Sequence, residues 1–462
     1  MKCLSLAAIL IITLLAACGP APAPAASTQV KPVAPAATAT PAPTLTPTVT
    51  VLPTTMPDTL TVDPAIDLGP ISPYLYGTNY GPMQAVVPEM MPLVEQAGFT
   101  ALRLPAGAWS DAMDLLPFQV DMFMSFCKQV GAIPTITVRL LNGKPETAAE
   151  LVRYTNIEQK YGVVYWSIGN EPSLYEAQHN GPYDTVTFNQ QWRAIALAMR
   201  AVDPTIKLMG PEIHQWNDSL ATTPKDSAGR DWMTEFLKAN GDLVDIVTVH
   251  RYPMYSPTNG QVTVQQLREN TKKWAVQIDY LKSLVRQVTG RDLPVAYTEI
   301  NSDPSAVMFN PASPDSFYNA IWYADVLGQM MQAKVFMVNQ WVISQRSTGL
   351  GLLYGADIRP SFYVFPLYKN FGSEQIYAAS GRPDVDIFAS KRPDGTLTLM
   401  VINLSDTQQR LPLKVQSVTL GDADVWLLDA THNAEHLGAQ ALPADGALTL
   451  PAQSATLYIL TP

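Results

Sequence analysis

The sequence predicts an α/β protein in which a (β/α)8 (TIM) barrel is followed by a C-terminal all-β sandwich. Strand-like and helix-like runs alternate from Asp58 to about Ser373, and no helical period survives beyond that point. Polar or aromatic side chains also follow most of the predicted barrel strands. Alternation of strands and helices favours a parallel sheet covered by helices, whereas short alternating strands favour a sandwich.

The first residues are typical of a targeting segment. Lys2 precedes an apolar run, Leu4–Ala17, that is too short to cross a bilayer as a mature helix. The run ends in Leu-Ala-Ala-Cys18, which resembles a bacterial lipoprotein lipobox. This resemblance implies a signal peptide over residues 1–17, lipidation of Cys18 and an extracytoplasmic, membrane-anchored protein. The alternative is an ordinary secretory signal with a chance cysteine.

Residues 18–57 are predicted to form a tether. The segment from Gly19 to Pro57 contains ten prolines and one charged residue, Lys31, so it is expected to be extended and to bury no core. Beyond the tether, Cys127 lies in an apolar helix-like run and is expected to be a buried structural cysteine.

Composition argues against two classes of protein. Apolar residues make up 47% of the chain and charged residues only 15%, which is atypical of a disordered chain. The formal net charge is −10 and no basic block is present, so the sequence gives no support for a nucleic-acid partner.

The predicted barrel domain spans residues 58–372. Its strands are expected at Tyr74–Asn79, Thr100–Leu104, Ile133–Val138, Val163–Ile168, Ile206–Met209, Val244–Val249, Pro294–Thr298 and Val335–Gln340. Helices are expected at Val120–Val130, Ala148–Tyr161, Thr187–Ala201, Trp232–Ala239, Val264–Val288 and Pro314–Gln332. Eight similarly spaced strands favour a barrel, and the missing Gly-x-Gly-x-x-Gly turn after the first strand disfavours a dinucleotide-binding fold.

The predicted sandwich spans residues 373–462. Its strands are expected at Val385–Phe388, Thr396–Leu404, Leu411–Val415, Asp424–Leu428 and Ala447–Leu460, separated by turn signals such as Pro393-Asp394-Gly395. An early strand, Thr59–Val62, is expected to complete this module, so residues 58–66 are predicted to pair with it.

Two glutamates follow the fourth and seventh predicted strands. Glu171 lies in Ser-Ile-Gly-Asn-Glu-Pro and Glu299 in Tyr-Thr-Glu-Ile-Asn. The carboxyl ends of barrel strands form the active-site face, so these two side chains are expected to face one cleft. Glycoside hydrolysis needs such a pair: one carboxyl group protonates the departing oxygen, and the other attacks the sugar carbon or activates water.

At these residues the chain resembles the clan A retaining glycoside hydrolases. The Asn-Glu-Pro motif after a fourth strand and the Thr-Glu motif after a seventh carry the resemblance, which covers residues 58–462. The appended β-module is similar to branches that contain xylosidases, arabinofuranosidases, endoglucanases and heparanase-like glucuronidases. The resemblance implies that Glu171 is the acid/base and Glu299 the nucleophile, and that a carbohydrate is the substrate.

The resemblance also implies roles for five further residues. Asn170 is expected to bind the sugar 2-hydroxyl, Arg103 and Tyr252 to keep Glu299 ionised, His250 to lie near the acid or the sugar, and Trp341 to stack on the cleaved sugar. Relatives often have Pro-Gly-Gly after the second strand where this chain has Pro-Ala-Gly, which leaves a backbone contact there in doubt. No cofactor is implied.

Other polar residues have plainer interpretations. Glu212 is interpreted as a loop or capping carboxylate, while His214 and His250 are equally compatible with a core or a site position. No His/Cys spacing predicts a catalytic metal, and no Gly-x-Ser-x-Gly elbow predicts a serine hydrolase. The alternative function is a catalytically inactive carbohydrate-binding surface lipoprotein on the same fold, or a scaffold whose β-module binds partners.

Overall fold

The computed structural model describes residues 52–81, 84–179, 181–254, 262–305, 308–417 and 421–460. The predicted signal peptide, Cys18 and most of the predicted tether lie outside these ranges. Within them, no helix combines the length and the apolar character that a bilayer crossing requires.

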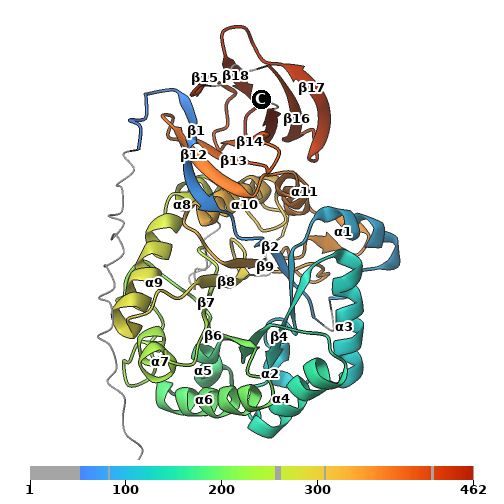
Figure 1. Cartoon of the computed structure of the whole chain (residues 1–462), viewed down its shortest axis with the longest axis vertical. Coiled ribbons are helices and arrows are strands. Elements are labelled where there is room, and N and C mark those ends of the chain that lie inside the picture. Colours follow the sequence, from blue (N-terminus) through green and yellow to red (C-terminus); the bar gives the residue numbers. More distant parts are fainter. Residues whose placement is uncertain are drawn as a thin grey trace, which may run out of the picture. The chain divides into compact units, whose positions relative to one another are not determined.

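Eight parallel strands close into a barrel in chain order. They are β2 (Tyr74–Asn79), β3 (Ala101–Leu104), β4 (Ile133–Val138), β5 (Tyr165–Ile168), β6 (Lys207–Ile213), β7 (Ile246–Arg251), β8 (Val295–Ile300) and β9 (Met337–Gln340). Every predicted barrel strand overlaps one of these, so the predicted fold class is confirmed (Figure 1). Because β1 lies outside the barrel, its fourth and seventh strands are β5 and β8.

Helices surround the strands (Figure 1). The longer ones are α1 (Met91–Ala97), α3 (Pro117–Val130), α4 (Pro145–Val152), α6 (Thr185–Val202), α7 (Trp232–Asn240), α8 (Val264–Thr271), α9 (Trp274–Thr289), α10 (Phe317–Gln332) and α11 (Val364–Lys369). Short turns of helix lie at α2 (Trp109–Ala112), α5 (Tyr175–His179), η1 (Pro88–Met90), η2 (Arg153–Glu158), η3 (Pro172–Leu174) and η4 (Pro360–Tyr363).

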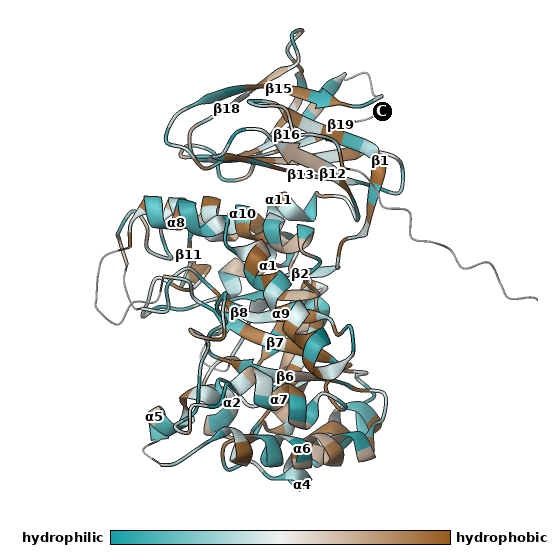
Figure 2. Cartoon of the chain, turned by 90° about the vertical axis from the view of Figure 1, so that its left-hand side faces the viewer, coloured by the Kyte–Doolittle hydropathy of each residue, from teal (hydrophilic) through white to brown (hydrophobic). Residues whose placement is uncertain are grey.

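Local capping and amphipathicity explain these helices. Side chains of Asp184, Asp231 and Ser316 accept hydrogen bonds from backbone N–H groups at the starts of α6, α7 and α10. Figure 2 shows α6 and α7 alternating between hydrophobic and hydrophilic colours, as expected of helices with one buried face.

Two predicted helices differ from the structure. The run predicted as Ala148–Tyr161 ends as an α-helix at Val152 and continues as the π-helical turn η2. The run predicted as Val264–Val288 is divided between α8 and α9. Near the end of α8, the side-chain oxygen of Asn270 accepts hydrogen bonds from the indoles of Trp274 and Trp322 at 3.0 Å each.

A second sheet has nine strands in the order β17-β16-β19-β14-β13-β12-β1-β15-β18. Their bounds are β1 (Leu60–Pro70), β12 (Glu374–Ser380), β13 (Val385–Lys391), β14 (Leu397–Asn403), β15 (Gln409–Val415), β16 (Asp422–Leu428), β17 (Glu435–Ala441), β18 (Ala447–Leu450) and β19 (Ser454–Leu460). Residues from β1, β13, β16 and β18 share one apolar core, so the sheet curls over itself as a sandwich does. A small hairpin joins β10 (Leu353–Tyr354) to β11 (Asp357–Ile358).

The early strand belongs to this second sheet. β1 runs antiparallel to β12 and parallel to β15 (Figure 1). The predicted single strand Ala447–Leu460 is wrong, because a turn at residues 451–453, where Gln453 has φ +47°, separates β18 from β19.

Helix α10 connects the two sheets. Nearly its whole circumference is buried, because α8 and α9 lie beside it and β13, β14 and β19 also contact it. Tyr318 at its start donates a 2.9 Å hydrogen bond to the carbonyl of Leu404.

Candidate active site

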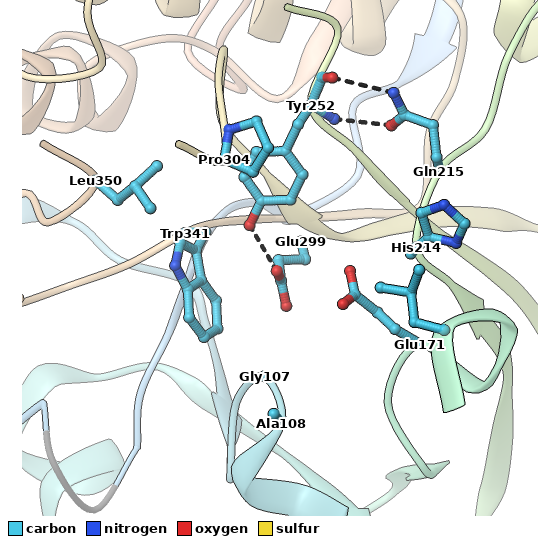
Figure 3. A pocket seen from close by; sticks show the side chains of 11 residues that line it. Gly107, Ala108, Glu171, His214, Gln215, Tyr252, Glu299, Pro304, Trp341 and Leu350 are labelled. Carbon is cyan, nitrogen blue, oxygen red and sulfur yellow. Dashed lines mark hydrogen bonds between the residues drawn. The ribbon is translucent and has the colours of Figure 1, made fainter. Parts of the chain in front are cut away.

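Five of the residues predicted at strand ends, Glu171, His214, Tyr252, Glu299 and Trp341, line one cavity at the carboxyl end of the barrel. The cavity has a volume of about 370 Å3 and is lined by Gly107, Ala108, Glu171, Leu174, His214, Gln215, Tyr252, Glu299, Pro304, Trp341 and Leu350 (Figure 3). A space of this size is within the range of small-ligand sites.

Glu171 follows β5 in a left-handed backbone conformation, with φ 50° and ψ 50°. Its N–H donates to the carbonyl of Glu212 at 2.9 Å, and Pro172 starts η3 directly after it. Left-handed backbone is unusual for a glutamate and costs of the order of 1 kcal/mol, so surrounding contacts must hold it. The side chain is 20% exposed and faces Glu299 across the cavity (Figure 3).

Glu299 lies in β8 with a side chain only 6% exposed. Its Oε1 accepts a 2.5 Å hydrogen bond from the hydroxyl of Tyr252, and its Oε2 lies 3.4 Å from Nη1 of Arg103. Burial raises the pKa of Glu299 and the charge of Glu171 raises it further, whereas His250, Arg103 and Tyr252 favour the ionised form. When Glu171 carries a proton, its charge no longer opposes ionisation of Glu299.

The two carboxylates are close enough for a direct displacement. One oxygen of Glu171, one oxygen of Glu299 and a ring nitrogen of His250 all lie within 4.8 Å of one another. Retaining glycosidases keep their carboxyl groups about 5–5.5 Å apart, whereas inverting enzymes need about 6.5–9.5 Å to admit a water. The separation therefore fits retention.

A third carboxylate lies behind this pair. Glu212, at the end of β6, is fully buried and its Oε2 lies 3.0 Å from Nε2 of His250. Burial disfavours its charged form, but Arg103 and His250 hold the pKa of Glu212 at about 2. The interpretation of Glu212 as a loop or capping residue is wrong, although its place at a barrel strand end was a usable signal.

His250 lies between the carboxylates. Its Nδ1 is 2.9 Å from Oε1 of Glu171 and 3.7 Å from Oε2 of Glu299. Burial opposes protonation of the ring, but the carboxylates outweigh it and raise the pKa of His250 to about 9. Because both ring nitrogens face carboxylates, the raised pKa favours the doubly protonated ring.

Asn170 is held from two sides. Its Oδ1 accepts a 2.8 Å hydrogen bond from Nη2 of Arg103, and its N–H donates to Oδ2 of Asp111 at 2.8 Å. Asp111, a residue the sequence reasoning missed, also accepts the N–H groups of Leu140 and Leu141. It therefore ties the loops after β4 and β5 to α2.

Trp341 and Tyr252 form part of the cavity wall (Figure 3). A Cβ added at Gly107, which has φ +63°, would lie 2.4 Å from Cη2 of Trp341, so the glycine allows the indole to approach. Gln215 binds both the N–H and the carbonyl of Tyr252 at 3.0 Å, which fixes the tyrosine backbone. No sequence signal pointed to Gln215.

His214 lies at the cavity edge. Its Nδ1 is 2.7 Å from the hydroxyl of Ser173, and burial lowers the pKa of His214. The structure thus brings together all seven predicted catalytic and binding residues, together with Glu212, His214 and Gln215. Their individual roles stay predictions.

Comparisons with known proteins identify relatives. A family model described as glycosyl hydrolases family 39 matches residues 151–423. An intracellular exo-α-(1→5)-L-arabinofuranosidase of Streptomyces lividans is 24% identical over 265 residues, covering 44% of this chain and 38% of that protein. Heparanase of Rattus norvegicus is 22% identical over 320 residues, covering 64% of this chain and 55% of the relative.

Solved structures share the fold. An α-L-arabinofuranosidase from Thermotoga maritima, in complex with arabinose, superposes with a TM-score of 0.69 at 19% identity and covers 87% of this chain and 99% of its own. At that identity the likeness concerns the fold alone. The chain spans between about a third and about a half of the length of the two sequence relatives above.

Proposed function

This chain belongs to family 39 of the glycosyl hydrolases, and from that membership we propose that it is a retaining glycoside hydrolase of oligo- or polysaccharides. The observation that carries the proposal is the pair Glu171 and Glu299, whose oxygens approach within 4.8 Å at the cavity. The environments of the two carboxylates differ in the way that double displacement requires.

In the first step Glu299 is the nucleophile. One of its oxygens forms a bond to the anomeric carbon while the glycosidic C–O bond breaks, and Glu171 gives its proton to the departing oxygen. Burial and the charge of Glu299 raise the pKa of Tyr252 well above its usual value, so the Tyr252 hydroxyl stays protonated and donates to Glu299. Arg103 supplies a fixed positive charge beside the same carboxylate.

In the second step Glu171 is the base. It takes a proton from water, the water oxygen forms the new bond to the anomeric carbon, and the ester bond to Glu299 breaks. Nδ1 of His250 lies 2.9 Å from Oε1 of Glu171, so the ring stands beside the base during this step. Asn170 and Trp341 are proposed to bind the sugar 2-hydroxyl and the sugar face.

The test is a panel of aryl glycosides that includes α-L-arabinofuranosides, xylosides and uronides, the first suggested by the name of a relative. Glu299→Gln is expected to lose activity at least about 10³-fold on every substrate. Glu171→Gln is expected to lose it mainly on substrates with poor leaving groups, because activated ones need little protonation. Glu150→Gln, whose side chain is 71% exposed, is the control and should match the wild type.

Labelling with a 2-deoxy-2-fluoro glycoside and mass spectrometry tests the nucleophile directly. We expect the label on the peptide that contains Glu299. Equal turnover by wild type and both glutamine variants would exclude the pair. Sugar binding without turnover by the wild type would instead favour the carbohydrate-binding lipoprotein.

We also propose that Cys18 carries a lipid that anchors the enzyme to the outside of a cell membrane. Support comes from the lipobox-like Leu15-Ala16-Ala17-Cys18 and the proline-rich segment after it. In cells fed a labelled fatty acid, the wild type should be labelled and sediment with membranes, whereas Cys18→Ala should be unlabelled and soluble. Equal membrane recovery of both would contradict the anchor.

A further inference from the structure

Glu212 is a buried carboxylate that has no part in the double displacement and does not line the cavity. Ser167 donates to its Oε1 at 2.5 Å, Thr298 donates to its Oε2, and Arg103 lies 3.7 Å from the same Oε2. A buried carboxylate with this many donors is held ionised and fixed in orientation. Its Oε2 is also 3.0 Å from His250, which touches the catalytic pair.

Charged groups approach His250 from several elements. Glu212 in β6 faces Nε2, while Glu171 after β5 and Glu299 in β8 face Nδ1. The charge of His250 helps to lower the pKa of His214, which follows β6, and Arg103 in β3 binds both Glu212 and Glu299. The hydroxyl of Tyr252, after β7, stays protonated and uncharged beside Glu299.

The formal charges of this cluster balance at a single state. Arg103 and His250 carry two positive charges, and Glu171, Glu212 and Glu299 can carry three negative charges. Neutrality therefore requires one proton shared by Glu171 and Glu299 if Glu212 stays ionised. This is the proton that glycoside cleavage uses.

The position of that proton depends on the state of His250. When both ring nitrogens are protonated, Nδ1–H donates to Oε1 of Glu171, so a proton on Glu171 must lie on Oε2. If Nδ1 lacked a proton, it would accept the proton of Glu171 at Oε1, and Oε2 would have nothing to give to the leaving oxygen.

We propose that Glu212 is a positioning residue that keeps His250 doubly protonated and thereby places the catalytic proton on Oε2 of Glu171. The inference rests on the proposed function and adds to it the atom that carries the proton. Glu212 does not itself line the cavity, and its side chain contacts His250 at 3.0 Å and Arg103 at 3.7 Å.

The experiment follows the ring nitrogens of His250 by NMR in 15N-histidine-labelled enzyme, with the signal assigned by its loss in His250→Asn. In the wild type we expect both nitrogens to stay protonated from pH 5 to 8, because the pKa of His250 is raised to about 9. In Glu212→Gln the midpoint should fall by about 1–3 pH units, because the ring loses an anion but keeps its burial. A neutral ring at pH 7 in the wild type would overturn the proposal without any variant.

The same variants separate charge from structure. Glu212→Asp keeps a negative charge at this position, so the midpoint of the His250 titration should return close to that of the wild type. Ser167→Ala removes a neutral donor to Glu212 and should leave the His250 ring protonated. An unchanged midpoint in folded Glu212→Gln would also overturn the proposal. Enzyme kinetics add a readout: Glu212→Gln should move the alkaline limb of kcat/KM to lower pH, most strongly for poor leaving groups.

Failure of this inference differs from failure of the proposed function. The NMR midpoints need no turnover, so a protonated His250 in an inactive protein contradicts only the function. An active enzyme with a neutral His250 contradicts only the role of Glu212.

Discussion

At the scale of single residues, the hydroxyl of Tyr252 is a direct donor to the proposed nucleophile, at 2.5 Å from Glu299. Tyr252→Phe removes that donor, and a hydrogen bond to a charged group contributes about 1.5–3 kcal/mol. We therefore expect kcat/KM to fall about 10- to 100-fold. Loss of the donor also raises the pKa of Glu299, so the acid limb of the kcat/KM profile should move to higher pH.

A pH series of initial rates for wild type and Tyr252→Phe measures both effects. Tyr377→Phe is the matched control, because it also removes a hydroxyl that donates a hydrogen bond, at 2.9 Å to the carbonyl of Pro53, but does so in β12 of the second sheet. An acid limb that stays in place in Tyr252→Phe would show that the hydroxyl does not stabilise ionised Glu299.

Residues differ in how far the sequence predicts their place. Glu171 and Glu299 follow strand-like runs, and the carboxyl ends of parallel barrel strands lie on the same face. The alternation of strands and helices was therefore enough to predict that the two residues lie near each other. Glu212 stands at an equivalent strand end, yet its environment depends on Arg103, His250 and Thr298 from three other strands. No local pattern reports such a convergence, and for this reason a loop role was inferred.

At the scale of the element, the short helix α2 places Asp111 under the active-site loops. Its carboxylate accepts N–H groups from Leu140, Leu141 and Asn170. Asp111→Asn presents an amide N–H₂ to some of these donors and leaves buried N–H groups unpaired. We expect unfolding in urea to cost about 2–4 kcal/mol less than in the wild type.

The same change should slow catalysis, because Asn170 and Glu171 follow directly on the released loop. A displacement of the acid of about 1 Å can cost about 100-fold in rate. Asp114→Asn is the control: this neighbour is 43% exposed and pairs with Arg139 at 3.8 Å, so stability should change by less than about 0.5 kcal/mol. If Asp111→Asn were as stable as the wild type, the Asp111 carboxylate would not hold the loops after β4 and β5 in place.

Elements were predicted best where period and burial agree. The predicted β2 and β4 have the observed bounds, because each lies between clear turn or helix signals and is mostly buried. β17 was missed because its residues are mostly exposed and carry a glycine, Gly438, with φ +74°. The prediction also missed the division of α8 from α9, near which Trp322 of α10 donates a hydrogen bond to Asn270.

At the scale of the whole molecule, the predicted order of barrel and β-module agrees with the structure, but their connection was not predictable. The sequence of α10 is apolar around most of the helix, which predicts that the helix is buried on every side. This pattern does not show which elements pack against it. Its partners come from strands about 60 to 140 residues later in the chain. Such long-range packing leaves no periodic signal.

The contact between Gly328 of α10 and the ring of Phe388 in β13 allows a test of this packing. Replacing a glycine inside a helix by alanine usually stabilises a protein by about 0.5–1 kcal/mol. Here an added Cβ would lie 2.1 Å from Cε2 of Phe388, so Gly328→Ala should instead destabilise by about 1–3 kcal/mol. Phe388→Ala alone should cost about 3–5 kcal/mol, since the ring is buried.

The double variant tests whether the effect of Gly328→Ala on stability changes sign when the ring of Phe388 is absent. Without the ring of Phe388, the new methyl group at position 328 has room, so Gly328→Ala should stabilise the Phe388→Ala protein by about 0.5–1 kcal/mol. Denaturant unfolding of the four proteins measures this cycle. If Gly328→Ala stabilised the wild type as well, α10 and β13 could not be packed as the structure has them. Because the altered residues lie away from the cavity, kcat/KM of the folded variants should equal that of the wild type.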